Sequence, residues 1–322
     1  MSGSSPPRKQ AGGSDSSDRP MTRSTHTSGG VAHAVFQALV LLALCVLYGL
    51  FLAQPIDLVT ADIGRHLKNG ELFFQSHLIP NTNLYSYNYP DHPFLNHHWA
   101  SGVMFYLVQK LTGFTGLSMF FIAVSLLTFF LFFRVAWQEG GFELAALTAL
   151  LVIPLLAIRR EIRPELFSYL FSGIFFWVLW NYRQRKLSKR WLAVLPLVEV
   201  CWVNLHIYFF IGLLLIALFL LDALPGDVGR PQDELRAQRN ALGLVLLVSA
   251  LAALANPSGL AGALHPLHIY DNYGYRVFEE RSVWFIERLF PFPHAIYFKV
   301  TFAVLLGSWV FALVTRTPLS LI

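Results

Sequence analysis

Residues 114–136 read FTGLSMFFIAVSLLTFFLFFRVA, and residues 142–158 read FELAALTALLVIPLLAI. A helix that spans a bilayer needs roughly 17 to 25 mostly apolar residues, and both runs meet this requirement. Further apolar runs occur on either side of this pair, at 32–53, 166–180, 191–204, 207–224, 240–256 and 297–314. The sequence therefore predicts an all-α fold, a polytopic transmembrane helical bundle of about eight spans.

The overall composition favours the same class. Hydrophobic residues make up 55% of the chain, charged residues make up 13%, and the mean hydropathy is +0.52, whereas soluble domains average about 25% charged residues. The net charge of +5 does not indicate a nucleic-acid partner, because the basic residues cluster beside apolar runs and anionic lipid headgroups. The two cysteines, Cys45 and Cys201, lie in apolar runs and cannot build a disulfide framework or a zinc cluster.

The N-terminal segment differs from the rest of the chain. Residues 1–30 are rich in Ser, Gly, Thr and Pro, with scattered Arg and Lys, which predicts a disordered cytoplasmic tail. The apolar run at 32–53 lacks a convincing cleavage site, so we expect a retained span rather than a signal peptide. Residues 31–322 are then one transmembrane domain.

The Lys and Arg residues of the loops predict the orientation of this domain, since short basic loops face the cytoplasm. Eight spans place the three most basic segments on one side, and these are 1–30, 181–190 and 225–239. The segments expected to face outward are 54–98, 159–165, 204–207 and 257–296. The two long outer loops, 54–98 and 257–296, are expected to form the active-site face. The outward turn at 159–165 is nevertheless basic, and a function is one explanation.

The first outer loop contains most of the polar chemistry of the chain. From Asp62 to His77, apolar residues at near-helical spacing alternate with charged ones, which predicts an amphipathic interfacial helix. The sequence PNTN then ends that helix. Residues 99–111 are apolar but too short to span, so we expect a second interfacial or re-entrant helix.

Two acids in this loop are candidate catalytic residues. Asp57 and Asp62 lie just outside a predicted span, where a carboxylate can act as a general base toward a hydroxyl or hold a divalent metal. Asp62 also precedes the amphipathic helix, so a helix N-cap is the alternative role. The two roles are compatible.

Histidines and arginines complete the candidate set. His66 lies four residues after Asp62, on the same helix face, and His97 and His98 lie where the loop re-enters the membrane. Asp62 and His98 are candidate metal ligands, and hydrogen bonding at the interface is the alternative. The candidate phosphate-binding residues are Arg159, Arg160 and Arg163, whose guanidinium forks match phosphate oxygens. Ion pairs with Glu161 and Glu165 are the alternative for these arginines.

Two further groups could contribute. Glu199 lies inside a predicted span, and an intramembrane carboxylate is a functional candidate or a structural hydrogen-bond partner. Asn204 and His206 follow at the outer end of that span. The run 271–288 mixes aromatic residues with charges that we expect to form mainly surface ion pairs. The sequence contains no P-loop, GxGxxG or GxSxG motif, so an activated substrate should supply the energy of any reaction.

Several short motifs resemble bacterial membrane proteins of the GT-C glycosyltransferase superfamily. In the first outer loop they are D-x-G-R-H-x-x-x-G at 62–70, I-P-x-T-N-x-Y-S-Y at 79–87 and N-H-H-W at 96–99. Later in the chain they are R-P-E-L-F-S at 163–168, W-V-N-L-H at 202–206 and N-P-S-G at 256–259. The resemblance covers roughly residues 32–300. It includes relatives that resemble protein mannosyltransferases and lipid A sugar transferases.

The resemblance implies sugar transfer from a polyprenyl-phosphate donor at the outer face of the bacterial cytoplasmic membrane. The acceptor would be a glycan, a lipid or a protein. Asp62 best matches the catalytic acid of the family, with Asp57 second. The family often has paired acids, whereas Ile63 and Gly64 follow Asp62 here, so a divalent metal stays possible but unassigned. Relatives often carry a further C-terminal domain, and we expect this chain to be a minimal or an incomplete form.

The sequence therefore predicts a glycosyltransferase that uses a lipid-linked sugar, with inversion at the sugar. Asp62 would deprotonate the acceptor hydroxyl, the three arginines would hold the donor phosphate, and His66, His97, His98 and His206 would line the pocket. The alternatives are a transporter or flippase of lipid-linked sugars, which needs polar residues through the bilayer centre, a non-catalytic membrane scaffold, and an inactive enzyme.

Overall fold

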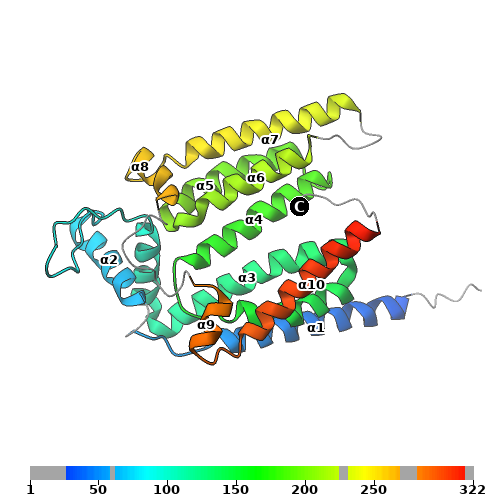
Figure 1. Ribbon diagram of the computed structural model, residues 1–322, viewed down its shortest axis with the longest axis horizontal. Coiled ribbons are helices and arrows are strands. Elements are labelled where there is room, and N and C mark those ends of the chain that lie inside the picture. The colour runs from blue at the N-terminus through cyan, green and yellow to red at the C-terminus, as the bar shows by residue number, and fades with distance from the viewer. Residues whose placement is uncertain (1–26, 59–61, 225–230, 269–280, 316–322) are drawn as a thin grey trace, which may run out of the picture. The chain divides into compact units, whose positions relative to one another are not determined.

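The computed structural model describes residues 27–58, 62–224, 231–268 and 281–315, with side chains from residue 30 onward. Every regular element in these ranges is a helix, apart from one isolated bridge between Thr82 and Pro93. This confirms the all-α class for the described part of the chain (Figure 1). Residues 1–26 of the predicted disordered tail lie outside the described residues.

The chain divides into two units, residues 1–40 and residues 41–322. Helix α1 (Thr27–Leu52) begins in the first unit, where Val35, Phe36 and Leu39 are exposed. The part of α1 in the second unit buries Leu44, Tyr48 and Leu52. Because α1 is apolar on all sides, its exposed residues suit a lipid environment.

The predicted amphipathic helix of the first outer loop is confirmed as α2 (Ile63–Ser76). It ends at His77, whose φ of 56° is left-handed. α2 packs tightly against the start of α3 (Trp99–Leu156). The contact is so close that a Cβ on Gly70 would lie 2.2 Å from the carbonyl oxygen of Gly102. Two glycines at the contact let the two backbones approach closely.

Helix α3 is a run of 58 residues that two glycines interrupt. Gly113 has φ of 71° and Gly141 has φ of 82°, and other residues rarely adopt such angles. The breaks separate helical segments at 99–112, 114–140 and 142–156. These are the positions where the sequence predicts a short interfacial helix followed by two longer ones.

Helices α4 to α7 form a packed group in the second unit, with α7 lying beside α5 and α6 (Figure 1). Their bounds are α4 (Glu165–Arg183), α5 (Val194–Leu205), α6 (Phe210–Asp222) and α7 (Gln232–Ala252), and the 3-10 turns η1 (Lys189–Ala193) and η2 (Ile207–Phe209) precede α5 and α6. Their shared core includes five fully buried side chains, those of Phe175, Leu179, Leu195, Trp202 and Ile216. The remaining elements are α8 (Gly259–Leu264), η3 (His265–Leu267), α9 (Val283–Leu289) and α10 (Ala295–Val314).

Three of the described helices are long and apolar enough to cross a membrane, namely 30–52, 99–156 and 295–314. A shorter apolar helix covers Ile207–Asp222. These helices are consistent with a membrane protein. The eight predicted spans stay a prediction, since α5 and α6 have only 12 and 13 residues.

The loops of the second unit gather at two ends of its helices. At one end, which we call the histidine end, Trp99 Nε1 donates to Asn204 Oδ1 at 2.8 Å, and Asn204 Nδ2 donates to the carbonyl of Ala255 at 2.8 Å. These contacts join three of the segments that the sequence predicts to lie on one side. At the other end, which we call the ion-pair end, Arg183 Nε donates to Asp222 Oδ2 at 2.7 Å. The cellular side of each end stays a prediction.

Candidate functional site

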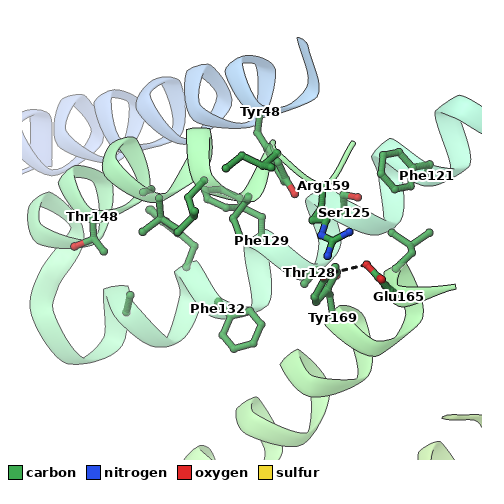
Figure 2. A pocket seen from close by; sticks show the side chains of 18 of the residues that line it. Tyr48, Phe121, Ser125, Thr128, Phe129, Phe132, Thr148, Arg159, Glu165 and Tyr169 are labelled. Atoms are coloured by element: carbon green, nitrogen blue, oxygen red, sulfur yellow. Dashed lines mark hydrogen bonds between the residues drawn. The ribbon is translucent and has the colours of Figure 1, made fainter. Parts of the chain in front are cut away.

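A largely apolar pocket of about 670 Å³ lies among α1, α3, α4 and the turn between α3 and α4. We call it the apolar pocket. Its walls come from aromatic and aliphatic side chains that include Phe121, Phe129, Phe132, Phe133, Val152 and Leu166. Figure 2 shows Phe129 and Phe132 projecting from α3, with Tyr48 of α1 nearby. A hydrocarbon chain would meet almost only apolar atoms along these walls.

Charged residues from the turn between α3 and α4 line one part of the apolar pocket. Arg159, Glu161, Arg163 and Glu165 all contribute to the lining. Arg163 Nε donates to Glu161 Oε2 at 2.7 Å, and the Arg163 side chain is 20% exposed. Figure 2 labels Arg159, Ser125 and Glu165 among the residues that line this pocket. Two of the three predicted phosphate-binding arginines, Arg159 and Arg163, therefore border an apolar cavity.

A second, smaller pocket adjoins the first. This polar pocket has a volume of about 250 Å³, and it shares Phe121 and Glu161 with the apolar pocket. Asp57 and Arg160 are part of its lining. The linings of these two adjoining pockets together include one predicted catalytic acid, Asp57, and all three predicted phosphate-binding arginines.

The other predicted catalytic acid lies in a different environment. Asp62 occupies the N-cap position of α2, but its side chain makes no capping hydrogen bond. Its Oδ1 lies 3.6 Å from Arg65 NH2, and its side chain is 50% exposed. The lining of the two pockets does not include Asp62. The geometry thus favours Asp57 over Asp62, although the sequence gives them the opposite order.

Histidines from three segments meet at the histidine end. His66 on α2 lies edge-on to His98 with ring centroids 4.7 Å apart, and His98 lies 4.4 Å from His97. His97 in turn lies 5.1 Å from His265, at the start of η3. His66 is 2% exposed and His98 is 6% exposed. We call His66, His97, His98 and His265 the histidine cluster.

Burial keeps the histidine cluster uncharged at neutral pH. It lowers the pKa of His66 to about 3 and the pKa of His97 to about 4, and it holds the pKa of His98 well below its usual value. Neighbouring cations, including Arg65, lower these pKa values further. Among the described residues, His66 Nδ1, His97 Nδ1 and His98 Nε2 have no hydrogen-bond partner. Such buried nitrogens can form hydrogen bonds with the hydroxyl groups of a polar ligand.

His206 is held by a hydrogen bond with Ser168 of α4. Its Nδ1 lies 2.7 Å from Ser168 Oγ, and Ser168 accepts a hydrogen bond from Trp202 Nε1 at 2.7 Å. Burial lowers the pKa of His206 to about 3. Ser168 and Trp202 lie in the motifs R-P-E-L-F-S and W-V-N-L-H, and only their contact across 34 residues reveals that these motifs meet.

The described residues contain no group of three or more His, Cys, Asp or Glu placed to hold a metal ion. The rings of His66, His97 and His98 meet edge to face instead of pointing at a common centre. Asp62, the other candidate ligand, is exposed at the start of α2. A divalent metal at Asp62 and His98 therefore stays a prediction from the sequence alone.

The remaining candidates lie away from both pockets. Glu199 is 0% exposed, and neither carboxylate oxygen has a hydrogen-bond partner among the described residues. Its Oε2 would lie 2.7 Å from a Cβ on Gly212, so the carboxylate is packed in the core of α4 to α6. Residues 271–280 of the predicted charged run lie outside the described residues. Farther along, Glu287 pairs with Lys299 at 2.5 Å.

The aromatic residues that shape the apolar pocket, such as Tyr48, Phe129 and Tyr169, are not among the site residues predicted from the sequence. Tyr169 donates to Glu165 Oε2 at 3.5 Å and lies on the pocket side of α4 (Figure 2). The spacing of four residues between Tyr169 and Glu165 could have indicated their contact, because such residues share a helix face.

Comparison of the chain with protein-family models, with curated proteins and with solved structures found no match.

Proposed function

We propose that this chain is a glycosyltransferase that moves a sugar from a polyprenyl-phosphate donor to an acceptor hydroxyl at the outer face of a bacterial cytoplasmic membrane. The observation that carries the proposal is the apolar pocket lined by Arg159 and Arg163, with Asp57 in the adjoining polar pocket. The GT-C resemblance of the outer-loop motifs supports the same reaction. The eight spans and the cytoplasmic N-terminus are part of the same proposal.

The lipid chain of the donor would occupy the apolar pocket. Its walls are mainly phenylalanine and aliphatic side chains from α3 and α4. An isoprenoid chain offers only apolar surface, and burying that surface is favourable by roughly 25 cal/mol per Å². The charged residues in one part of the pocket would leave the phosphate beside the turn at 159–165.

The arginines would then hold the donor phosphate. Arg159 and Arg163 can each present two parallel N–H groups to phosphate oxygens. Glu161, which accepts from Arg163 Nε at 2.7 Å, fixes the orientation of that side chain. As the sugar departs, negative charge grows on the leaving phosphate, so these cations stabilise the transition state more than the ground state.

Asp57 would serve as the general base. The acceptor oxygen attacks the anomeric carbon, the bond between that carbon and the phosphate oxygen breaks, and Asp57 takes the hydroxyl proton. Polyprenyl phosphate leaves with the bonding electron pair. Asp57 and Arg160 line the same polar pocket, and this position supports the role of Asp57 as the base. Asp62 stays the second candidate because the family motif matches it best.

The histidines would position the sugar or the acceptor. His66, His97 and His98 are uncharged at neutral pH, so each ring can donate one hydrogen bond and accept another. Burial is the largest cause of the low pKa of His66, and Arg163 makes the smallest contribution. His206 is fixed by Ser168 at the same end of the helices.

The test is sugar transfer by the purified protein in liposomes, with radiolabelled polyprenyl-phosphate sugars, with and without EDTA. Wild type should transfer the label, and Asp57→Asn should lose about 100-fold or more of the rate. Asp62→Asn is the matched variant and should lose less. No transfer by the folded wild type from any of these donors would overturn the proposal. The EDTA arm decides whether a divalent metal takes part.

One observation favours a flippase of lipid-linked sugars as the second candidate. Glu199 is a fully buried carboxylate without a partner among the described residues, and such a group inside a membrane helix often lies on a transport path. Translocation of a labelled lipid-linked sugar across the liposome membrane, lost in Glu199→Gln and without any transfer, would favour this candidate.

A further inference from the structure

A wide groove lies at the ion-pair end, between the start of α5 and the first half of α7. Its volume is about 1190 Å³. Residues of the segment that connects α4 with α5 line one side, and α7 lines the other. We call it the basic groove. Its lining is distinct from that of the apolar and polar pockets, because it shares no residue with either of them.

The rim of the basic groove carries excess positive charge. Four cationic side chains line it, Arg183, Arg185, Lys189 and Arg190, against one acidic side chain, Glu234. Arg183 is paired with Asp222 and Arg185 with Glu234. Lys189 and Arg190 take part in none of the ion pairs among the described residues. Two positive charges at the groove are therefore not balanced by the described acids.

The walls below this rim are apolar and exposed. Leu197 on α5 is 69% exposed, and Leu244 and Val248 on α7 are 63% and 41% exposed. Leu244 and Val248 are four residues apart, so they form one continuous stripe on α7. A phospholipid at the membrane surface has a charged headgroup next to its hydrocarbon chains. The basic groove has cationic side chains next to exposed aliphatic side chains, so the two arrangements match.

We propose that the basic groove binds one anionic phospholipid of the surrounding bilayer. Lys189 and Arg190 contact its phosphate group, and its acyl chains lie along the aliphatic walls of α5 and α7. Charge complementarity selects this occupant: a zwitterionic lipid would leave the two cations without a net negative partner, and an apolar protein segment would leave them beside uncharged atoms. The inference requires a membrane location but does not depend on the proposed sugar transfer.

Native mass spectrometry of the detergent-purified full chain tests this inference. Phosphatidylglycerol and phosphatidylcholine with the same acyl chains are titrated into wild type, the double variant Lys189→Gln/Arg190→Gln, and Arg236→Gln. Arg236 is the matched control because it is an exposed cation on α7 that does not line the groove. Thermal melting and size-exclusion profiles establish that each variant is folded.

Wild type should bind one phosphatidylglycerol at least about tenfold more tightly than phosphatidylcholine, because each basic residue near an anionic headgroup strengthens attraction severalfold. The double variant should lose most of this preference, and Arg236→Gln should keep it. Inorganic phosphate should not displace the lipid, since it lacks the acyl chains. Equal affinity for both lipids, equal loss in the control variant, or displacement by inorganic phosphate would overturn the inference.

Discussion

Arginines lie at both ends of the helices of the second unit, and their surroundings differ. At the ion-pair end, Arg183 and Arg185 pair with acids on neighbouring helices, Asp222 and Glu234. At the histidine end, Arg159 and Arg163 border the apolar pocket. Charge that is neutralised across helices stabilises an arrangement of helices, whereas charge beside a cavity can meet a ligand. Arg163 also pairs with Glu161, but within its own turn, so this pair does not join two helices as those of the ion-pair end do. This difference supports the histidine end as the place of the proposed transfer.

Polar groups other than the arginines also differ between the two ends. At the histidine end, three histidine nitrogens are buried and lack partners among the described residues, although such groups are usually paired. At the ion-pair end, Trp180 Nε1 donates to Glu139 Oε1 at 2.8 Å, and Arg183 also lies over the Trp180 ring. Trp180, Glu139 and Arg183 at the ion-pair end thus contact one another, whereas the three histidine nitrogens are available to a ligand.

The largest expected effect comes from removing both arginines of the apolar pocket. The double variant Arg159→Ala/Arg163→Ala should lose about 1000-fold in transfer rate, because one donor to a developing negative charge is worth about 100- to 1000-fold. Arg185→Ala is the control, since Arg185 pairs with Glu234 at the ion-pair end. Initial rates in liposomes measure both. Equal losses in the two proteins would remove the functional distinction between the ends.

The second prediction concerns the contact that positions the first outer loop. Gly70→Ala places a Cβ 2.2 Å from the Gly102 carbonyl oxygen, so α2 must shift, at a cost of about 1–3 kcal/mol in the free energy of unfolding. Gly64→Ala on the same helix meets nothing within 4 Å and should be neutral or stabilise by about 0.5–1 kcal/mol. Denaturant unfolding in detergent measures both changes. If Gly70→Ala is as well tolerated as Gly64→Ala, the close contact between α2 and α3 is wrong.

Near neutral pH the smallest expected effect is the dependence of stability on pH, and it grows as the solution is acidified. The folded pKa of His66, about 3, lies below its ordinary value of 6.5, so the unfolded chain binds more protons between these pH values. Stability is therefore complete above pH 6.5 and falls as the pH drops toward 3, by at most about 1.4 kcal/mol per pH unit for this group. His66→Gln should flatten the pH profile of unfolding, and the exposed His92→Gln is the control. Equal flattening in both variants would contradict a special role for burial of His66.

Much of the fold could be predicted from the sequence because local patterns encode it. Apolar runs predict the positions of α4, α6 and α10 to within a few residues, and the glycines at 113 and 141 mark the breaks in α3. Helix length is less certain: α7 begins at Gln232, eight residues before the predicted run, because charged residues form its first two turns. Apolarity alone cannot detect a helical extension that is polar.

The candidate site was predictable only in part, since contacts distant in sequence create it. The resemblance of the sequence motifs predicts Asp62 as the catalytic acid, but Asp57 is the acid that lines the polar pocket with Arg160, which is distant in sequence. Nothing in the local pattern shows which acid faces that turn. The three arginines lie within one short turn and line the two adjoining pockets, and their binding of phosphate stays a prediction.

In the proposed reaction the apolar pocket, and not the basic groove, receives the polyprenyl phosphate. The most direct measurement is photo-crosslinking of a polyprenyl phosphate with a photoreactive group on its chain, followed by mass spectrometry of the labelled peptides. We predict crosslinks to residues 121–156 of α3, lost in Arg159→Ala/Arg163→Ala and kept in Lys189→Gln/Arg190→Gln. Crosslinks concentrated on 234–248 of α7, or unchanged labelling in Arg159→Ala/Arg163→Ala, would contradict the account.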